Sequence, residues 1–377
     1  MKDQPARCSP DLGLAQAMAG HFPVCAVVQE VQPLGSGLIN TTFAVQAQAG
    51  HFVLQRINAS VFANPPLIMD NLARLQQAIA GAGADAQPPR LPRFFATTSG
   101  ELLARDAQGG YWRLLERIEQ GAPLNAVKSA AQARAIGRLL GQFHRFGARL
   151  PVADYHVTLP QSHDTLGYRA ALDEVVKTLS ASAGPGTGDS PALDAQAAAV
   201  LEQVHAHDQI LHSLQEVRTA GLIKKTLVHG DPKRDNVLFD HQGERALCLI
   251  DLDTVQPGFI LYDIGDCLRS CCNRACGTIP EQVHFDAQLA EALLGGYAEA
   301  APDLLSAVER ELLFDAMRLV PLELVMRFLT DHLRGDQYFR VRFRGENLHK
   351  AIAQLALVAD IERQEPQLRG LGRRLGS

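Results

Sequence analysis

Short runs of β-branched and aromatic residues, separated by turn residues, fill the first third of the chain and predict a small antiparallel sheet. The predicted strands cover residues 24–33, 42–48, 51–57, 91–97, 101–105 and 111–118. One amphipathic helix is inserted among them. It begins at Asn64-Pro65-Pro66, where asparagine can cap a helix and proline fits the first turn, and it ends at Gly81.

Long helical periodicities replace this pattern after Gly121. The predicted helices cover residues 126–149, 167–181, 192–221, 285–300 and 308–333. Residues 182–191, with three glycines and two prolines, predict a surface loop. We therefore expect an α+β protein with a small antiparallel β-rich N-lobe over residues 1–118 and a larger, mainly helical C-lobe over residues 119–377. Two lobes also suit a length that exceeds what one hydrophobic core usually organises.

Charge and hydropathy exclude several classes of protein. The chain has 36 Lys+Arg and 41 Asp+Glu, a formal net charge of −5, which argues against a nucleic-acid or anionic-membrane binder. No apolar run approaches the roughly 20 residues of a membrane helix, and the first residues lack the pattern of a signal peptide. We expect a cytoplasmic protein, and the oligomeric state stays open.

Five of the seven cysteines lie between residues 248 and 276, too few in so long a chain for a disulfide framework. Cys267 and Cys271 are spaced i, i+4, as are Cys272 and Cys276, so a helix would bring the thiols of each pair together. Metal ligation is one interpretation. No pair of histidines flanks them, and we favour buried thiols that pack a helix.

The strongest chemical signal is a polar loop followed by a strand that ends in acids. Residues 229–231 (His-Gly-Asp) open the loop, Lys233 and Asn236 follow, and an apolar run leads to Asp251. Phosphoryl transfer from ATP requires a carboxylate for the attacking hydroxyl, a cation near the transferred phosphate, and oxygen ligands for Mg²⁺. The spacing from Asp231 to Asn236 matches the protein-kinase loop H-R-D-x-x-x-x-N.

This spacing predicts a role for each residue. Asp231 is the expected catalytic base, and Lys233 the cation on the γ-phosphate. Asn236 and Asp251 are the expected magnesium ligands, with ATP and Mg²⁺ as cofactors. Asp253, two residues farther on, is a candidate for acceptor binding. A polar hairpin with incidental charges is the alternative interpretation.

With these motifs the chain resembles the aminoglycoside phosphotransferase and choline kinase-like superfamily, which has the protein-kinase fold and phosphorylates small molecules. Residues 229–231 and 250–251 are its two hallmarks. The segments most like the N-acetylhexosamine 1-kinases are residues 37–43, 52–58, 252–258, 261–266 and 327–331. The chain differs from that subfamily at Leu38, Thr41 and Gly230.

The resemblance implies a protein-kinase-like two-lobed fold and a sugar kinase that phosphorylates the anomeric hydroxyl of an N-acetylhexosamine. Another small alcohol or amine is the alternative acceptor: choline, homoserine, methylthioribose or an aminoglycoside. A nucleotide-binding pseudokinase is an alternative from a different class. The four central positions all hold competent residues, which argues against it.

Glycines and one cation of the first lobe are candidates for ATP binding. Gly35 and Gly37 lie between the first two predicted strands, where they form either a phosphate-covering loop or only a flexible turn. Asn40, just beyond them, is a candidate for contact with phosphate or substrate hydroxyls. We therefore expect Gly35 and Gly37 to bind ATP, and Asn40 to bind the substrate.

The third strand should carry a cation for the inner phosphates. Arg56 is the only one there, and by alternation it shares a face with Leu54, which could cover adenine. Gln55 in the inward register is the alternative. Asp70 is the only acid of the following helix between residues 64 and 79, so we expect it to pair with Arg56.

Two further segments complete the predicted site. The strand that ends at residues 116–118 leads into the helical half, so backbone groups from Glu116 to Ile118 are expected to bind adenine as an interlobe hinge. Arg327 lies on the amphipathic stretch 308–333 and could donate hydrogen bonds to sugar hydroxyls or an acetamido carbonyl. The alternative is an i, i+4 ion pair of Arg327 with Glu323 or Asp331.

Overall fold

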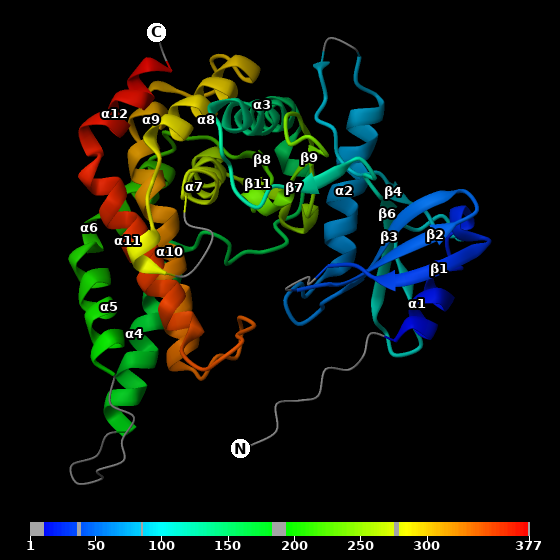
Figure 1. Ribbon diagram of the computed structural model, residues 1–377, viewed down its shortest axis with the longest axis horizontal. Coiled ribbons are helices and arrows are strands. Elements are labelled where there is room, and N and C mark those ends of the chain that lie inside the picture. Colours follow the sequence, from blue (N-terminus) through cyan, green and yellow to red (C-terminus); the bar gives the residue numbers. More distant parts are fainter. Residues whose placement is uncertain (1–10, 36–38, 84–85, 183–193, 275–278, 376–377) are drawn as a thin grey trace. The chain divides into compact units, whose positions relative to one another are not determined.

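The computed structural model describes residues 11–35, 39–83, 86–182, 194–274 and 279–375 (Figure 1). The chain divides into two compact units, residues 1–86 with 90–121 and residues 87–89 with 122–377. The predicted boundary after residue 118 lies close to this division. The first unit is a β-rich structure and the second is mainly helical, so the predicted α+β architecture is confirmed.

The sheet of the first unit is antiparallel throughout, with the order β1-β2-β3-β6-β4 and with β5 also paired to β6. Its strands are β1 (Val28–Pro33), β2 (Thr41–Ala47), β3 (Gly50–Ile57), β4 (Phe94–Phe95), β5 (Ala104–Arg105) and β6 (Tyr111–Glu116). Two predicted strands are much shorter than expected. Pro92 has no N–H to give to a ladder, and β4 begins only at Phe94. The run from residue 24 starts with a 3₁₀ turn, Pro23–Cys25, before β1.

Two helices cover opposite faces of this sheet. Helix α1 (Leu12–Ala19), which the sequence pattern did not predict, packs on the face that carries Phe43, Leu54 and Trp112. Helix α2 (Pro65–Ala80) lies on the other face. The side chain of Gln76 on α2 accepts from the N–H of Phe94 at 2.7 Å and donates to its carbonyl at 3.3 Å. These bonds fix α2 against β4.

The second unit combines helices with two small antiparallel sheets, of order β10-β9-β7 and β11-β8 (Figure 1). The helices are α3 (Ala130–Gly147), α4 (Thr165–Ser182), α5 (Ala195–Ala206), α6 (Asp208–Thr219), α7 (Ile260–Cys271), α8 (Ala287–Ala300), α9 (Ala307–Glu311), α10 (Leu313–Leu333), α11 (Glu346–Arg363) and α12 (Glu365–Arg374). The strands are β7 (Gly121–Pro123), β8 (Thr226–Val228), β9 (Val237–Asp240), β10 (Ala246–Leu249) and β11 (Gln256–Gly258).

The helical prediction differs from the structure in two ways. The single helix predicted over residues 192–221 is divided into α5 and α6 at His207, which leaves helical geometry at φ −97° and ψ 14°. The predicted stretch 308–333 is likewise divided, into α9 and α10, and helices α7, α11 and α12 lie outside the predicted ranges. Within the described ranges, no helix combines the length and the apolar character needed to cross a membrane.

Glycines allow α3 and α8 to cross at short distance. A Cβ atom at Gly137 would lie 1.8 Å from the carbonyl oxygen of Leu293, and one at Gly296 would lie 2.0 Å from that of Arg134. Backbone therefore packs directly on backbone at this crossing. The crossing also places His144 of α3 beside Tyr297 of α8, with Nδ1 2.9 Å from the phenolic oxygen.

Four cysteines of the predicted cluster lie in the core: Cys248, Cys267, Cys271 and Cys272 are all buried. Burial raises the pKa of the Cys272 thiol well above its ordinary value, which keeps it neutral. The prediction that these thiols pack in the interior is confirmed for the four. Cys276 lies outside the described residues.

Candidate active site

The predicted catalytic loop joins β8 to the β9–β10 hairpin, and it brings three predicted site residues together. The Nζ atom of Lys233 lies 2.6 Å from Oδ2 of Asp231. Asn236, in a 3₁₀ turn, donates through Nδ2 to the carbonyl oxygen of Asp231 at 2.8 Å and to its Oδ2 at 3.0 Å. The amide therefore orients the carboxylate of Asp231.

Asp251 follows β10 and is connected to the same loop through its neighbour. The N–H of Ile250 donates to the carbonyl oxygen of Asn236 at 2.9 Å, and the carbonyl of Ile250 lies 3.1 Å from Nε2 of His229. Asp251 itself is exposed and has a φ of 62°, in the left-handed region. Such a conformation costs on the order of 1–3 kcal/mol in a residue other than glycine and is concentrated at functional sites.

Burial and mutual attraction set the protonation of the central pair. Burial raises the pKa of Asp231, although the adjacent Lys233 ammonium opposes the shift. Burial also disfavours the charge on Lys233, but the carboxylate of Asp231 outweighs it and raises the pKa of Lys233. The two side chains remain 28% and 31% exposed, so a reactant can reach both. A carboxylate with a raised pKa is the better proton acceptor.

Asp263 of α7 fixes the start of the catalytic loop by accepting hydrogen bonds from its backbone. Its carboxylate is 1% exposed and accepts the backbone N–H of His229 at 2.7 Å, that of Gly230 at 2.9 Å, and Nε2 of His144 at 2.9 Å. Burial alone would raise the pKa of Asp263, but the bond from His144 and the charges nearby outweigh it and lower the pKa. Asp263 is therefore an ionised support of the loop.

Gly230 is required by the same geometry. Its φ is +83°, and a Cβ atom there would lie 2.5 Å from the carbonyl oxygen of Thr254. The hydroxyl of Thr254 donates to the carbonyl of His229 at 2.7 Å. Spacing in the sequence did not reveal the roles of Asp263 and His144, because these residues are separated from the loop by long stretches of chain.

The structure does not pair Arg56 with Asp70, so that prediction is wrong. Arg56 lies on the α1 face of β3, where Nη2 is 3.2 Å from Oδ2 of Asp106. Asp70, on α2 at the opposite face, accepts from Nε of Arg74 at 3.0 Å. Leu54 is fully buried in the core beneath α1, which leaves it no surface to cover adenine.

The α2 face of the sheet carries Gln55 and a cation from the neighbouring strand. Arg113 of β6 donates to Oε1 of Gln55 through Nε at 3.0 Å and Nη2 at 2.7 Å, and its Nη1 lies 3.8 Å from the sulfur of Met69. Arg113 is only 2% exposed. The sequence pattern did not indicate this arginine, because the protein-kinase pattern places the cation on the third strand. The role of Arg56 at the phosphates stays a prediction.

The remaining candidates of the first unit have mixed outcomes. Gly35 has a φ of 68°, and Gly37 lies outside the described residues. Oδ1 of the buried Asn40 accepts the N–H of Asn58 at 3.0 Å, which links the ends of β2 and β3.

The predicted hinge is partly engaged in the first unit. The N–H of Glu116 donates to the carbonyl of Arg93 at 2.8 Å, and its carboxylate pairs with Arg90. The carbonyl of Ile118 accepts the N–H of Gly121 at 3.2 Å. Backbone recognition of adenine by this segment stays a prediction.

Arg327 lies among aromatic rings. Its guanidinium carbon is 5.3 Å from the ring centres of Tyr168 and Phe339 and 5.8 Å from that of Tyr338. The i, i+4 partners considered for it bind elsewhere. Glu323 accepts from His163 at 2.6 Å and from the hydroxyl of Thr165 at 2.5 Å. The carboxylate of Asp331 accepts backbone N–H groups of residues 337–339.

Asp253 lies deeper than the other candidates. It is 1% exposed and belongs to the 3₁₀ turn Leu252–Thr254. Contact with an acceptor at this position stays a prediction.

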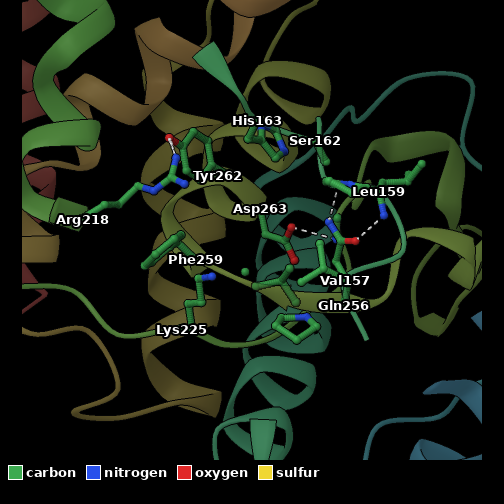
Figure 2. Close-up of a pocket in the computed structure, with 15 residues that line it drawn as sticks. Val157, Leu159, Ser162, His163, Arg218, Lys225, Gln256, Phe259, Tyr262 and Asp263 are labelled. Carbon is green, nitrogen blue, oxygen red and sulfur yellow. Dashed lines mark hydrogen bonds between the residues drawn. The ribbon is translucent and has the colours of Figure 1, made fainter. Parts of the chain in front are cut away.

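A pocket of about 90 Å³ borders the rear of the catalytic loop and is drawn in Figure 2. Gly230 and Asp263 line it on the loop side. Arg218 lies across the pocket, with Nη1 3.2 Å from the phenolic oxygen of Tyr262 and its guanidinium carbon 4.8 Å from the ring centre of Phe259. The pocket thus abuts the supports of the loop, and Asp231 is not among its lining residues.

Comparison with known proteins agrees with this geometry. Residues 30–302, well over half of the chain, match the family described as the phosphotransferase enzyme family. The chain belongs to this family. It is also similar to a homoserine kinase of Pseudomonas aeruginosa (strain UCBPP-PA14), with 27% identity over 284 residues, which is 75% of either chain.

Two solved structures have a similar fold. An aminoglycoside phosphotransferase from Alicyclobacillus acidocaldarius matches with a TM-score of 0.65 and 14% identity, over 96% of both chains. A microcompartment-associated aminopropanol kinase matches with a TM-score of 0.63 and 18% identity, over 97% of this chain and 100% of that one. The predicted superfamily is confirmed, and with it the prediction of a small-molecule phosphotransferase.

Proposed function

We propose that this phosphotransferase is an ATP- and Mg²⁺-dependent sugar kinase that acts on the anomeric hydroxyl of an N-acetylhexosamine. The observation that carries the proposal is the assembly of Asp231, Lys233 and Asn236 around one carboxylate, with Asp251 on the adjoining strand end. These are the groups that phosphoryl transfer from ATP requires. A pseudokinase would have no use for all four.

The donor set fits Mg²⁺. Asn236 uses its Nδ2 for Asp231, which leaves its side-chain Oδ1 for a cation, and Asp251 presents an exposed carboxylate. Mg²⁺ prefers such oxygen ligands and binds few of them from protein. When bound, the ion would neutralise charge on the phosphates of ATP.

The residues of this chain would act in a simple order. Asp231, fixed by Asn236, orients the acceptor hydroxyl and takes its proton while the hydroxyl oxygen bonds to the γ-phosphorus and the bond to ADP breaks. Lys233 moves its charge from Asp231 to the γ-phosphate. Asp263 keeps the loop in place during the reaction.

Support for a sugar acceptor comes from Arg327 and from the sequence resemblance. Both acids one helical turn away from Arg327 bind other groups, so its guanidinium keeps donors for an acceptor. The rings of Tyr168 and Phe339 beside it offer flat apolar surface for a sugar ring. The homoserine kinase and aminopropanol kinase relatives make small amino alcohols the second candidate class.

An ADP-release assay tests the proposal. The purified protein is given ATP and Mg²⁺ with N-acetylglucosamine, N-acetylgalactosamine, homoserine, choline, methylthioribose or an aminoglycoside, and the phosphorylated product is identified by NMR. Turnover of an N-acetylhexosamine to its 1-phosphate is the expected result, with Asp231→Asn as the inactive control. Turnover of an amino alcohol alone would reject the sugar, and ATP binding without any turnover would favour the pseudokinase.

A further inference from the structure

Helix α7 runs alongside the catalytic loop and contacts the loop both near its start and farther along, at Arg234. Asp263 accepts the N–H groups of His229 and Gly230, and the hydroxyl of Ser270 accepts the N–H of Arg234 at 3.0 Å. Positions 263, 266 and 270 follow the i, i+3, i+7 spacing of one helical face. Asp266 therefore lies on the loop side of α7, between the two contacts, level with the segment that holds the catalytic base.

The carboxylate of Asp266 is buried but only half used. The residue is 7% exposed, and its Oδ1 accepts Nε of Arg269 at 2.9 Å and Nη2 at 2.6 Å. Its Oδ2 is buried and has no hydrogen-bond partner among the described residues. A buried polar atom left in this state costs on the order of 1–3 kcal/mol, and in a native protein its partner is an ordered water, an ion or a group of a ligand.

Charge effects agree with this placement. Besides burial and Lys233, the charge of Asp266 acts on Asp231 and raises its pKa. Burial disfavours the charge on Arg269, but Asp266 outweighs it, and the pKa of Arg269 is raised. Arg269 thus forms an ion pair with the carboxylate of Asp266 and fixes its orientation. An ionised carboxylate only accepts hydrogen bonds, so the free oxygen requires a donor.

We propose that Asp266 is a specificity-determining residue whose Oδ2 accepts a hydrogen bond from a second donor group of the acceptor, close to the hydroxyl that reacts at Asp231. This inference rests on the proposed function. In an N-acetylhexosamine the donor is another ring hydroxyl or the acetamido N–H. The subsite selects acceptors with two neighbouring donors over simple monohydric alcohols, because only the former satisfy the buried oxygen. Arg269 is its positioning residue.

The test is a double-mutant cycle between Asp266→Asn and single groups of the acceptor. Asparagine keeps the shape of the side chain but loses its charge. We expect the variant to raise the KM for the acceptor by roughly 10- to 100-fold, the effect of a lost charged hydrogen bond, with the KM for ATP changed less than about twofold. The acceptors are N-acetylglucosamine, its 3-, 4- and 6-deoxy derivatives, and 2-deoxyglucose, which lacks the acetamido group.

With one of these derivatives, wild type and Asp266→Asn should have the same acceptor KM, because that derivative lacks the group that Asp266 binds. The inference would be overturned if Asp266→Asn raised the acceptor KM by the same factor with every derivative, or if it left the acceptor KM unchanged. Asp263→Asn is the matched control on the same helix: it should lower kcat with all acceptors alike. Asp266→Ser, which places a smaller hydrogen-bonding hydroxyl at this position, replaces Asp266→Asn if circular dichroism shows that the asparagine variant is unfolded.

The two proposals can fail separately. If wild type phosphorylates no sugar, the proposed function falls, and the cycle is run with homoserine and with 4-hydroxybutyrate, which lacks the amino group. A difference between wild type and Asp266→Asn that is confined to homoserine would then support the subsite. The same loss with both acceptors would overturn it.

Discussion

Replacing Asp263 by asparagine should weaken the second unit and misplace its catalytic loop. In the native protein one oxygen of Asp263 accepts from His229 and His144, and the other accepts from Gly230. Asparagine has a single acceptor oxygen, so in either orientation its NH₂ group faces at least one buried N–H. An unsatisfied N–H costs about 1–3 kcal/mol, and the remaining bonds lose their charge assistance, so we expect a total of about 2–4 kcal/mol.

The assay is urea denaturation followed by far-UV circular dichroism, together with kcat measured well below the transition. The control is Asp70→Asn, which removes an exposed ion pair with Arg74 that should be worth less than about 1 kcal/mol. If Asp263→Asn unfolds at the same urea concentration as Asp70→Asn and keeps wild-type kcat, then the hydrogen bonds of Asp263 do not support the loop.

The effect should also depend on pH with a definite sign. Burial raises the pKa of Asp263, but the bond from His144 together with the charges and N–H groups nearby outweighs it, so the pKa in the folded protein lies below the unfolded value of about 3.9. The stability that its charge contributes is therefore complete above about pH 4 and is lost as the pH falls through the lower folded pKa. The difference between wild type and Asp263→Asn should be constant at neutral pH and should shrink under acid conditions.

Four further substitutions have expected outcomes. Asp231→Asn should lower kcat by roughly 10²–10⁴ with little change in the KM for ATP, measured by ADP release. Asp251→Ala should abolish most activity and raise the Mg²⁺ concentration needed for half-maximal rate, and an unchanged Mg²⁺ titration would contradict its role. Arg327→Ala should raise the sugar KM by about one to two orders of magnitude, whereas a lower melting temperature alone would mean a structural role. Gly137→Ala should lower the free energy of unfolding, measured by thermal denaturation, by about 1–3 kcal/mol, because its methyl group would collide with the carbonyl of Leu293.

The catalytic loop was predictable because its chemistry is local in sequence. Asp231, Lys233 and Asn236 lie close together in the sequence, between positions 231 and 236, and the structure joins them by hydrogen bonds. The β-rich and helical halves were predictable for the same reason, since periodicity is a local property. The supports of the loop were not. His144 and Asp263 come from separate helices, and only the packed fold brings them together.

The error at Arg56 has a similar cause. Alternation along a strand correctly placed Leu54 and Arg56 on one face, but it does not say which helix covers that face. The sequence pattern does not predict α1, and without that helix the face of Leu54 and Arg56 cannot be told from the face toward α2. Arg113, on the neighbouring strand, lies on the α2 face instead. A face can be assigned only when both layers that cover the sheet are known.

The hydrogen bonds of its two carboxylate oxygens distinguish Asp266 from Asp263 and Asp331, two other buried acids of the second unit. Asp331 accepts three backbone N–H groups and Nδ2 of Asn347, and Asp263 accepts three donors, so both oxygens of each carboxylate are engaged within the protein. Asp266 lies one turn after Asp263 on the same helix face, is buried almost as deeply, and keeps one oxygen unused. Folding alone does not explain that oxygen, because an amide or an apolar side chain would stabilise α7 at less cost. The cost is explained if the missing donor arrives with the substrate.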